Sequence, residues 1–253
     1  MCYCAMASNT LGNRVLLACD FDHTIMDKNT DTWIWKLLPG GKVPEEITNH
    51  FEQHNSWRDY LTEILNFMHS LGITPKQIVD CIKEMSFTPG MKELLRYQSE
   101  HDNIDCIILS DSNAVFIDAC LEGENLRESV KHVITNPSQF DDSGCLKIKH
   151  YHSHDCPLNS CPKNLCKRRA LREYIQGQEQ GGVHYSHICY VGDGSNDFCP
   201  SLTLHEKDFV FPRIGHSLIN KIKRQKNEGK VFRAKVIPWK SGDKIVKTLK
   251  TLI

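Results

Sequence analysis

Three short apolar runs stand out along the chain, and each ends in polar residues. They cover Arg14–Phe21, Asn103–Ser110 and His187–Gly192. Runs of this length with polar flanks are typical of buried parallel strands, which are apolar on both faces. An Asp-bearing loop follows each run. The pattern therefore predicts three strands whose carboxyl ends carry acidic side chains.

Weaker patterns fill the second half of the chain. Further strands are expected at Lys131–Thr135, Asp208–Phe211 and Arg233–Ile237, and helices at Ala114–Glu122, Lys163–Gln176, His216–Gln225 and Lys244–Leu252. Strands that alternate with helices are typical of an α/β fold built on a parallel sheet.

The segment between the first two acidic loops has a different period. Its apolar residues largely follow helical spacing: Ile47, Phe51, Trp57, Leu61, Ile64, Leu65, Met68, Leu71, Ile78, Ile82 and Met85. This spacing predicts a helical cap over residues 28–87, called the cap segment below, inserted after the first strand. Residues 14–27 and 88–253 would form the α/β core, and residues 1–13 a disordered extension. A cap at the acidic edge would cover a substrate and exclude water.

Composition narrows the classes of function. The chain has 253 residues, 31 Lys and Arg against 31 Asp and Glu, and 40% hydrophobic residues. Such an apolar fraction excludes a disordered chain, and balanced charge disfavours binding to nucleic acid or to an anionic membrane through the overall field. No apolar run reaches the roughly 18–20 residues of a membrane-spanning helix, and the N-terminus lacks a secretory signal. We expect a cytoplasmic protein with a small substrate; the sequence leaves the oligomeric state open.

The chain has twelve cysteines. Without a secretory signal, they indicate reduced thiols in place of a disulfide framework. Cys19, Cys106 and Cys189 lie inside the predicted strands, where cysteine packs as a small apolar side chain.

The acidic loops are the main candidates for chemistry. In an open α/β sheet, ligands bind outside the carboxyl ends of the strands, so the three loops are expected to meet at one crevice. Asp20 and Asp22 follow the first strand. One carboxylate of such a pair can attack phosphorus, and the other can protonate the leaving oxygen and then activate water. A role in a turn or helix cap also explains a lone pair of this kind.

Asp193 and Asp197 follow the third strand, one helical turn apart. Carboxylate oxygens are the hard ligands that Mg²⁺ accepts, and a bound Mg²⁺ would neutralise phosphate charge.

Four motifs in order resemble the haloacid dehalogenase superfamily of phosphatases, whose signature is DxDxT, a Ser or Thr, a Lys and GDxxxD. They are Asp20-Phe21-Asp22-His23-Thr24, Ser110, a lysine near 167, and Gly192-Asp193-Gly194-Ser195-Asn196-Asp197. Lys163 also lies at the start of the predicted helix, but Lys167 aligns better.

The resemblance implies a role for each of these residues. Asp20 would be the nucleophile and Asp22 the general acid and base, while Ser110 and Lys167 would hold the phosphoryl oxygens. The Mg²⁺ ligands would be Asp20, Asp193, the backbone carbonyl of Asp22, and Asp197 directly or through water. Thr24 would brace the first loop.

Four segments are similar to a smaller family, that of phosphoethanolamine/phosphocholine phosphatases and pyridoxal phosphate phosphatases. They are Asp20–Ile34, Ile108–Ile117, Cys161–Lys167 and Tyr190–Pro200, and the similarity runs from about Arg14 to Ile253. This family implies a three-layer, Rossmann-like parallel sheet core with a helical cap after the first motif. Pyridoxal phosphate is the expected substrate of an aspartyl-phosphate mechanism, with phosphoethanolamine, phosphocholine or pyrophosphate as alternatives.

Substrate choice would depend on residues beside the motifs. Asp31 and Asp111 follow the first and second motifs and suit a cationic group on the substrate; a helix cap and a turn are the structural alternatives. Trp33 is a candidate for stacking on a pyridine ring, whereas Trp57 and Phe51 are expected in the core of the cap.

The segment 150–166 gathers possible metal ligands: His150, His152, His154, Cys156, Cys161 and Cys166. Four such ligands can close a structural Zn²⁺ site, but C-x₄-C-x₄-C is not the usual pair of short knuckles. Free thiols in a loop are the alternative. A non-catalytic binding module that uses this segment is the competing function from another class.

Overall fold

The computed structural model describes residues 13–54, 57–158 and 161–253. Apart from Asn13, the extension predicted for residues 1–13 therefore lies outside the described residues. Within these three ranges the strands are β1 (Val15–Cys19), β2 (Ile104–Asn113), β3 (His132–Asn136), β4 (Ser138–Phe140), β5 (Leu146–Ile148), β6 (His187–Gly192), β7 (Phe209–Pro212) and β8 (Lys235–Val236). The helices are α1 (Thr30–Trp33), α2 (Glu45–His54), α3 (Trp57–Ser70), α4 (Pro75–Lys83), α5 (Met91–Ser99), α6 (Ala114–Gly123), α7 (Lys167–Gln180), α8 (Phe198–Ser201), α9 (Ser217–Asn227) and α10 (Gly242–Leu249).

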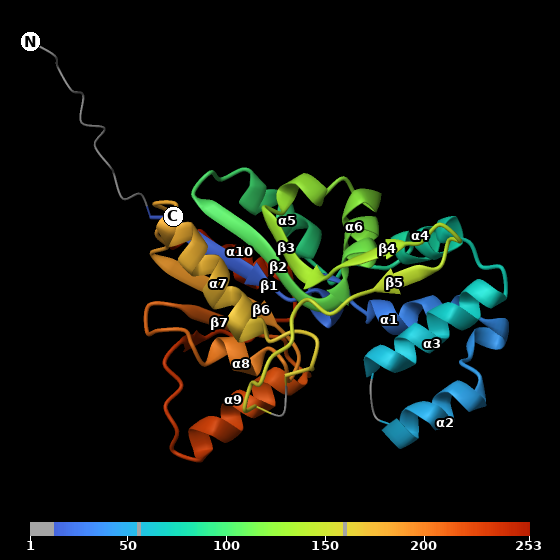
Figure 1. Ribbon diagram of the computed structural model, residues 1–253. Coiled ribbons are helices and arrows are strands. Elements are labelled where there is room, and N and C mark those ends of the chain that lie inside the picture. The colour runs from blue at the N-terminus through green and yellow to red at the C-terminus, as the bar shows by residue number, and fades with distance from the viewer. Residues whose placement is uncertain (1–12, 55–56, 159–160) are drawn as a thin grey trace, which may run out of the picture.

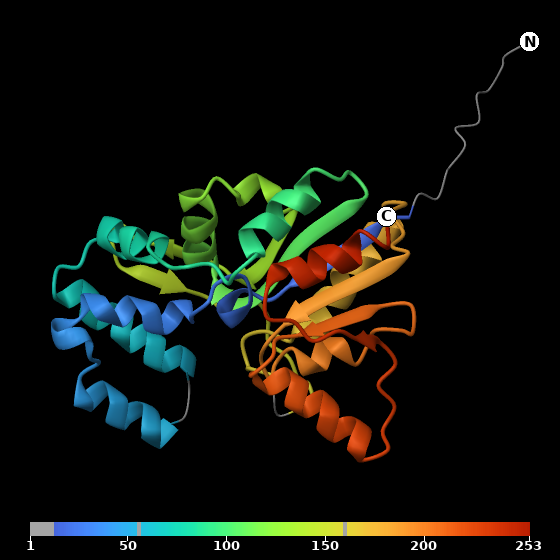
Figure 2. The same ribbon diagram turned by 180° about the vertical axis from the view of Figure 1, so that it is seen from behind.

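Six strands form one parallel sheet in the order β3-β2-β1-β6-β7-β8. Helices cover both faces, because successive side chains of a strand point to opposite sides. Val15 and Leu17 pack with α5, α6 and α10, while Leu16 and Ala18 pack with α7 and α9. Figures 1 and 2 show these two helical layers from opposite sides. The predicted three-layer α/β fold is confirmed.

Buried thiols fill part of this core. Cys19, Cys106 and Cys189 are at most 1% exposed, which confirms their expected role as small apolar side chains. No helix in the described part of the chain is long and apolar enough to cross a membrane.

Helices α1–α4 all fall within the cap segment and lie together at one end of the sheet (Figure 1). The two connections to the core run side by side, since Met26 pairs with Phe87 in an antiparallel bridge. The Asp27 amide donates to the Ser86 carbonyl at 3.0 Å. The antiparallel pair β4–β5, which the sequence did not predict, lies beside α3 and α6 (Figure 1).

Asp105 joins the amino ends of the strands, at the edge opposite the acidic loops. It is 4% exposed and accepts hydrogen bonds from Arg14, Lys131 and Tyr185. Burial alone would raise the pKa of Asp105, but the donors outweigh burial and lower it. The charged carboxylate therefore ties together the starts of β1, β2, β3 and β6.

We predict that Asp105→Asn lowers the free energy of unfolding by about 2–4 kcal/mol at pH 7, because charged hydrogen bonds are lost in a buried place. The folded pKa lies below the unfolded one, so the difference from wild type should shrink as pH falls below about 4. Urea unfolding at several pH values measures it. Asp80→Asn, which breaks an exposed pair with Lys76, should cost less than about 0.5 kcal/mol. Equal losses in both variants would contradict the prediction.

Candidate active site

The register of the central strands brings the acidic loops together. Cys19, the last residue of β1, lies opposite Ile108 of β2 and Val191 of β6. Asp20 therefore follows β1 at the level where its neighbours continue to Ser110 and Asp193. Three loops far apart in sequence meet at the carboxyl edge of the sheet because the strands are parallel and in step.

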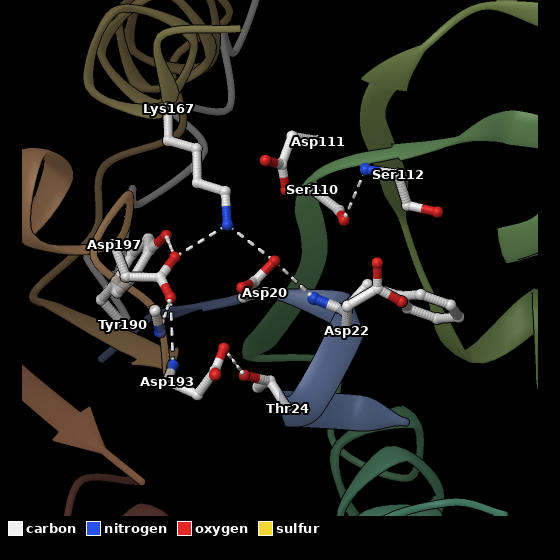
Figure 3. A network of polar contacts seen from close by, with 12 residues as sticks. Asp20, Asp22, Thr24, Ser110, Asp111, Ser112, Lys167, Tyr190, Asp193 and Asp197 are labelled. Carbon is white, nitrogen blue, oxygen red and sulfur yellow. Dashed lines mark hydrogen bonds and ion pairs between the residues drawn. The ribbon is translucent and has the colours of Figure 1, made fainter. Parts of the chain in front are cut away.

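Lys167 is the centre of the charged cluster. Its Nζ lies 2.6 Å from Oδ1 of Asp20 and 2.8 Å from Oδ1 of Asp197, and its side chain is fully buried. Figure 3 shows Lys167 reaching down from α7 between the two carboxylates. Burial alone would lower the pKa of Lys167, but the charges of Asp197 and Asp20 raise it, so the ammonium stays charged. Lys163, the other candidate, is exposed.

Asp197 organises the loop after β6. Its Oδ1 accepts from Lys167 and from the Tyr190 hydroxyl at 2.7 Å, while Oδ2 accepts from the backbone amides of Asp193 and Gly194 at 3.0 and 2.8 Å. A Cβ on Gly192 would stand 2.5 Å from Cγ of Asp197, so only glycine permits this approach. Four hydrogen bonds occupy the carboxylate, which favours a positioning role for Asp197.

Asp193 faces the same space and has two side-chain partners. The Thr24 hydroxyl donates to Oδ1 at 3.4 Å, and Nδ1 of His216 lies 2.9 Å from Oδ2. Thr24 therefore links the first loop to the loop after β6. Burial and the charge of Asp197 raise the pKa of Asp193 to about 7.

The donor set fits a divalent cation. Oxygens of Asp20, Asp193 and Asp197 lie within 4.8 Å of one another, and all three residues are buried. Burial and the charge of Asp197 raise the pKa of Asp20 despite Lys167. Three buried carboxylates beside one ammonium leave negative charge that a cation would balance, and their hard oxygens suit Mg²⁺.

Asp22 lies on the other side of Asp20, facing the cap segment (Figure 3). Its Oδ1 accepts from the Thr30 amide at 2.9 Å, and its Oδ2 from the Thr30 hydroxyl and the Asn29 amide group. Burial and the nearby charge of Asp31 raise the pKa of Asp22, which favours the protonated acid. Ser110 is fully buried, and its Oγ accepts from the Ser112 amide at 3.2 Å.

A cavity of about 140 Å³ adjoins Asp22. Its lining combines the cap segment with the loop after β1, the end of β2 and the loop before α7: Asp22, Asn29, Asp31, Trp57, Arg58, Asp111, Pro162 and Asn164. Trp57 donates to Oδ2 of Asp31 at 2.8 Å. Oδ1 of Asp31 and Nε and Nη1 of Arg58 are buried with no hydrogen-bond partner in the described structure. These polar atoms are suited to a ligand in the cavity.

The structure differs from three expectations about this region. Trp33 is not among the residues that line the cavity; its indole donates to the Cys81 carbonyl at 2.8 Å, inside the helices of the cap segment. Trp57, expected in the core of the cap, is 40% exposed and lines the cavity. The helix expected at Lys163–Gln176 begins at Lys167, because Cys166 has an extended backbone and its amide donates to His152.

Sequence reasoning missed Tyr190, His216 and Arg58. Tyr190 lies in a strand whose apolar pattern explains an aromatic residue without a polar role. His216 caps α9, far along the chain from Asp193. Arg58 follows Trp57 on an amphipathic helix, and only the folded structure shows that it faces Asp31 and Asp111.

Known proteins are similar to this chain in sequence and in fold. A family described as "Putative Phosphatase" matches residues 15–253. The chain belongs to this family. Pyridoxal phosphate phosphatase PHOSPHO2 of Mus musculus is 39% identical to this chain over 241 residues, which is 95% of this chain and 99% of the relative. Phosphoethanolamine/phosphocholine phosphatase of Gallus gallus is 33% identical over 242 residues, 95% of this chain and 89% of the relative.

Solved structures show the same fold. A phosphoserine phosphatase structure described as a phospho-aspartyl intermediate analogue covers 93% of this chain and 99% of its own, with a TM-score of 0.59 at 16% identity. Membership of this family identifies the chain as a phosphomonoester hydrolase, and the solved structures share its fold. The family therefore favours an enzyme over the non-catalytic binding module.

We predict that Tyr190→Phe lowers kcat about tenfold and leaves KM unchanged, because Asp197 loses a donor that holds the loop of Asp193 in place. Steady-state phosphate release measures both constants. Tyr97→Phe on α5, on the outer layer of the core, should retain wild-type kcat. Unchanged kcat in a folded Tyr190→Phe protein would contradict the positioning role.

Proposed function

We propose that this protein is a Mg²⁺-dependent phosphatase that hydrolyses pyridoxal 5'-phosphate through an aspartyl phosphate on Asp20. The main observation in support of this mechanism is the contact of Asp20 with Lys167, beside Asp193. Both Lys167 and the Phe21 amide hold Oδ1 of Asp20, at 2.6 and 2.7 Å. Oδ2 is then the oxygen of Asp20 that attacks.

In the first step, Oδ2 of Asp20 forms a bond to phosphorus as the bond from phosphorus to the ester oxygen breaks. Asp22 gives its proton to that oxygen, which leaves as the alcohol. The raised pKa of Asp22, caused by burial and by the charge of Asp31, favours the protonated form that this step needs.

In the second step, Asp22 accepts a proton from water as the water oxygen bonds to phosphorus. The bond between phosphorus and Asp20 breaks, and inorganic phosphate leaves. Mg²⁺ held by Asp20, Asp193 and the backbone carbonyl of Asp22 would neutralise phosphoryl charge, with Asp197 orienting this loop. Lys167 and the Ser110 hydroxyl would donate to phosphoryl oxygens.

The cavity lined by Arg58 and Asp31 supports pyridoxal phosphate as the substrate. The pyridine ring of pyridoxal phosphate carries a basic nitrogen and an acidic phenol, so the ring presents both a positive and a negative charge. Asp31 and Asp111 would face the pyridinium and Arg58 the phenolate, while Trp57 offers an aromatic surface. A choline or ethanolamine group is cationic and would meet an unfavourable charge in Arg58.

The relatives also support this choice, since the pyridoxal phosphate phosphatase of Mus musculus is 39% identical and the phosphoethanolamine/phosphocholine phosphatase of Gallus gallus 33%. Phosphoethanolamine, phosphocholine and pyrophosphate are the alternative substrates of the same machinery. A small cavity suits small metabolites. The ten described cysteines are free, which agrees with the reducing conditions of a cytoplasmic location.

We predict that Asp20→Asn and EDTA each abolish phosphate release, because one removes the nucleophile and the other the cation. Release should be measured on pyridoxal phosphate, phosphoethanolamine, phosphocholine and pyrophosphate, with Mg²⁺ restored after EDTA. Pyridoxal phosphate should have the highest kcat/KM. Equal release by wild type and Asp20→Asn would overturn the aspartyl-phosphate mechanism, and a different best substrate would overturn only the assignment of the leaving group.

We predict that Arg58→Met lowers kcat/KM for pyridoxal phosphate about tenfold relative to phosphocholine, which corresponds to about 1.4 kcal/mol. Asp31→Asn should lower kcat/KM for both substrates, because both carry a cationic group. Thermal unfolding of each variant serves as the folding control. An unchanged ratio in folded Arg58→Met would contradict the role of Arg58 in selectivity.

The effect of Asp31 has a pH signature. Burial outweighs the Trp57 hydrogen bond and the charge of Arg58, and raises the pKa of Asp31 to about 6. Below pH 6 the carboxyl group loses its charge, so KM for pyridoxal phosphate should rise. The substrate also titrates, but it does so equally for all variants. The ratio of KM between wild type and Asp31→Asn at each pH therefore isolates the contribution of Asp31.

A further inference from the structure

Four cysteines from two parts of the chain meet at one point outside the catalytic cluster. They are Cys156 and Cys161 after β5, Cys166 immediately before α7, and Cys199 in α8, and their sulfur atoms all lie within 4.8 Å of one another. Sγ of Cys156 lies 3.5 Å from Sγ of Cys161 and 3.6 Å from Sγ of Cys199. Cys199 lies 33 residues beyond the segment that the sequence marked.

These distances distinguish between a disulfide and a metal site. A disulfide requires about 2.05 Å between its sulfur atoms, so the four thiols are not paired. Zinc bound by four thiolates at about 2.3 Å in a tetrahedron places its sulfur atoms about 3.8 Å apart. The observed separations are close to that edge length without a change of backbone.

The neighbouring histidines have other partners. Nε2 of His152 accepts from the Cys166 amide at 3.0 Å, and Nδ1 of His154 accepts from the Cys156 amide at 3.2 Å. Nε2 of His154 lies 2.6 Å from the Pro162 carbonyl and donates to it. These side chains hold the backbone that carries the cysteines, which leaves the four sulfurs as the ligand set.

We propose that Cys156, Cys161, Cys166 and Cys199 bind one structural Zn²⁺. Four protein ligands fill the tetrahedron, so the ion has no open position for a substrate. Four thiolates exceed the charge of zinc by two, and nearby cations reduce the excess: Nη2 of Arg168 lies 3.9 Å from Sγ of Cys156, and Lys221 interacts electrostatically with Cys161.

The site would fix the position of catalytic groups without touching the substrate. Cys166 precedes Lys167, and Cys199 lies two residues after Asp197, so one ion would join the backbone on both sides of the Lys167–Asp197 ion pair. Pro162 and Asn164, between two of the ligands, line the substrate cavity. The zinc proposal depends on the sulfur positions alone, and stands or falls independently of the proposed phosphatase substrate.

Elemental analysis of the full chain tests the proposal. The protein is produced in zinc-supplemented medium and purified anaerobically without chelators. We expect one zinc per chain in the wild type, and loss of that zinc in Cys161→Ser and Cys199→Ser. Cys145→Ser changes a buried thiol of the β4–β5 hairpin and should keep its zinc. Asp193→Asn should also keep it, because the carboxylate cluster is a separate site.

Cobalt substitution gives a second measurement, which is made on the wild-type protein and therefore does not depend on whether a variant folds. Co²⁺ bound by four thiolates gives intense sulfur-to-metal charge-transfer bands and tetrahedral visible bands, whereas an oxygen-ligated Co²⁺ does not. Absence of zinc from the wild type, zinc retained by both cluster variants, or disulfides among these cysteines in the anaerobic protein would overturn the proposal. Each readout is independent of phosphate release, so a wrong substrate assignment would not affect the result.

Discussion

The ion pair system of Lys167 with Asp20 and Asp197 is the constraint on which the rest of the site depends. A buried ammonium costs several kcal/mol in lost hydration, and only close carboxylates offset that cost. Because Asp20 follows β1, Asp197 follows β6 and Lys167 begins α7, three elements must meet within hydrogen-bond distance. The same contact that stabilises the buried charge also orients the carboxylate that is proposed to attack phosphorus.

Two groups of charges lie on opposite sides of Asp22. The carboxylates around Lys167 belong entirely to the core, while Asp31 and Arg58 come from the cap segment. The first group suits the phosphoryl group and its cation, which every phosphomonoester shares. The second would face the leaving group, which differs among substrates. Asp22 lies between them, where it can transfer a proton to the one atom common to both halves of a substrate.

Much of this arrangement could be predicted from the sequence, because apolar runs with acidic ends are local signals. The motifs pointed to Asp20, Asp22, Lys167 and Asp193, which the structure brings together although they lie far apart in the sequence. Groups defined only by tertiary contact could not be predicted: Arg58 has the appearance of a helix surface residue, and Tyr190 that of a core aromatic residue. Cys199 belongs to a cluster whose other members are more than 30 residues away. The strands β4 and β5 have three residues each, which is too few to give a periodic signal.

The antiparallel bridge between Met26 and Phe87 has a consequence for how such proteins diverge. The helical segment leaves the core and returns to it at adjoining points, so its two ends are fixed beside each other whatever lies between them. A different insertion with the same end-to-end spacing would close on the same core at little cost. Under the proposed function, much of the selectivity would be encoded in an exchangeable stretch of sequence, which evolution could alter as a unit while the machinery for bond cleavage stays intact.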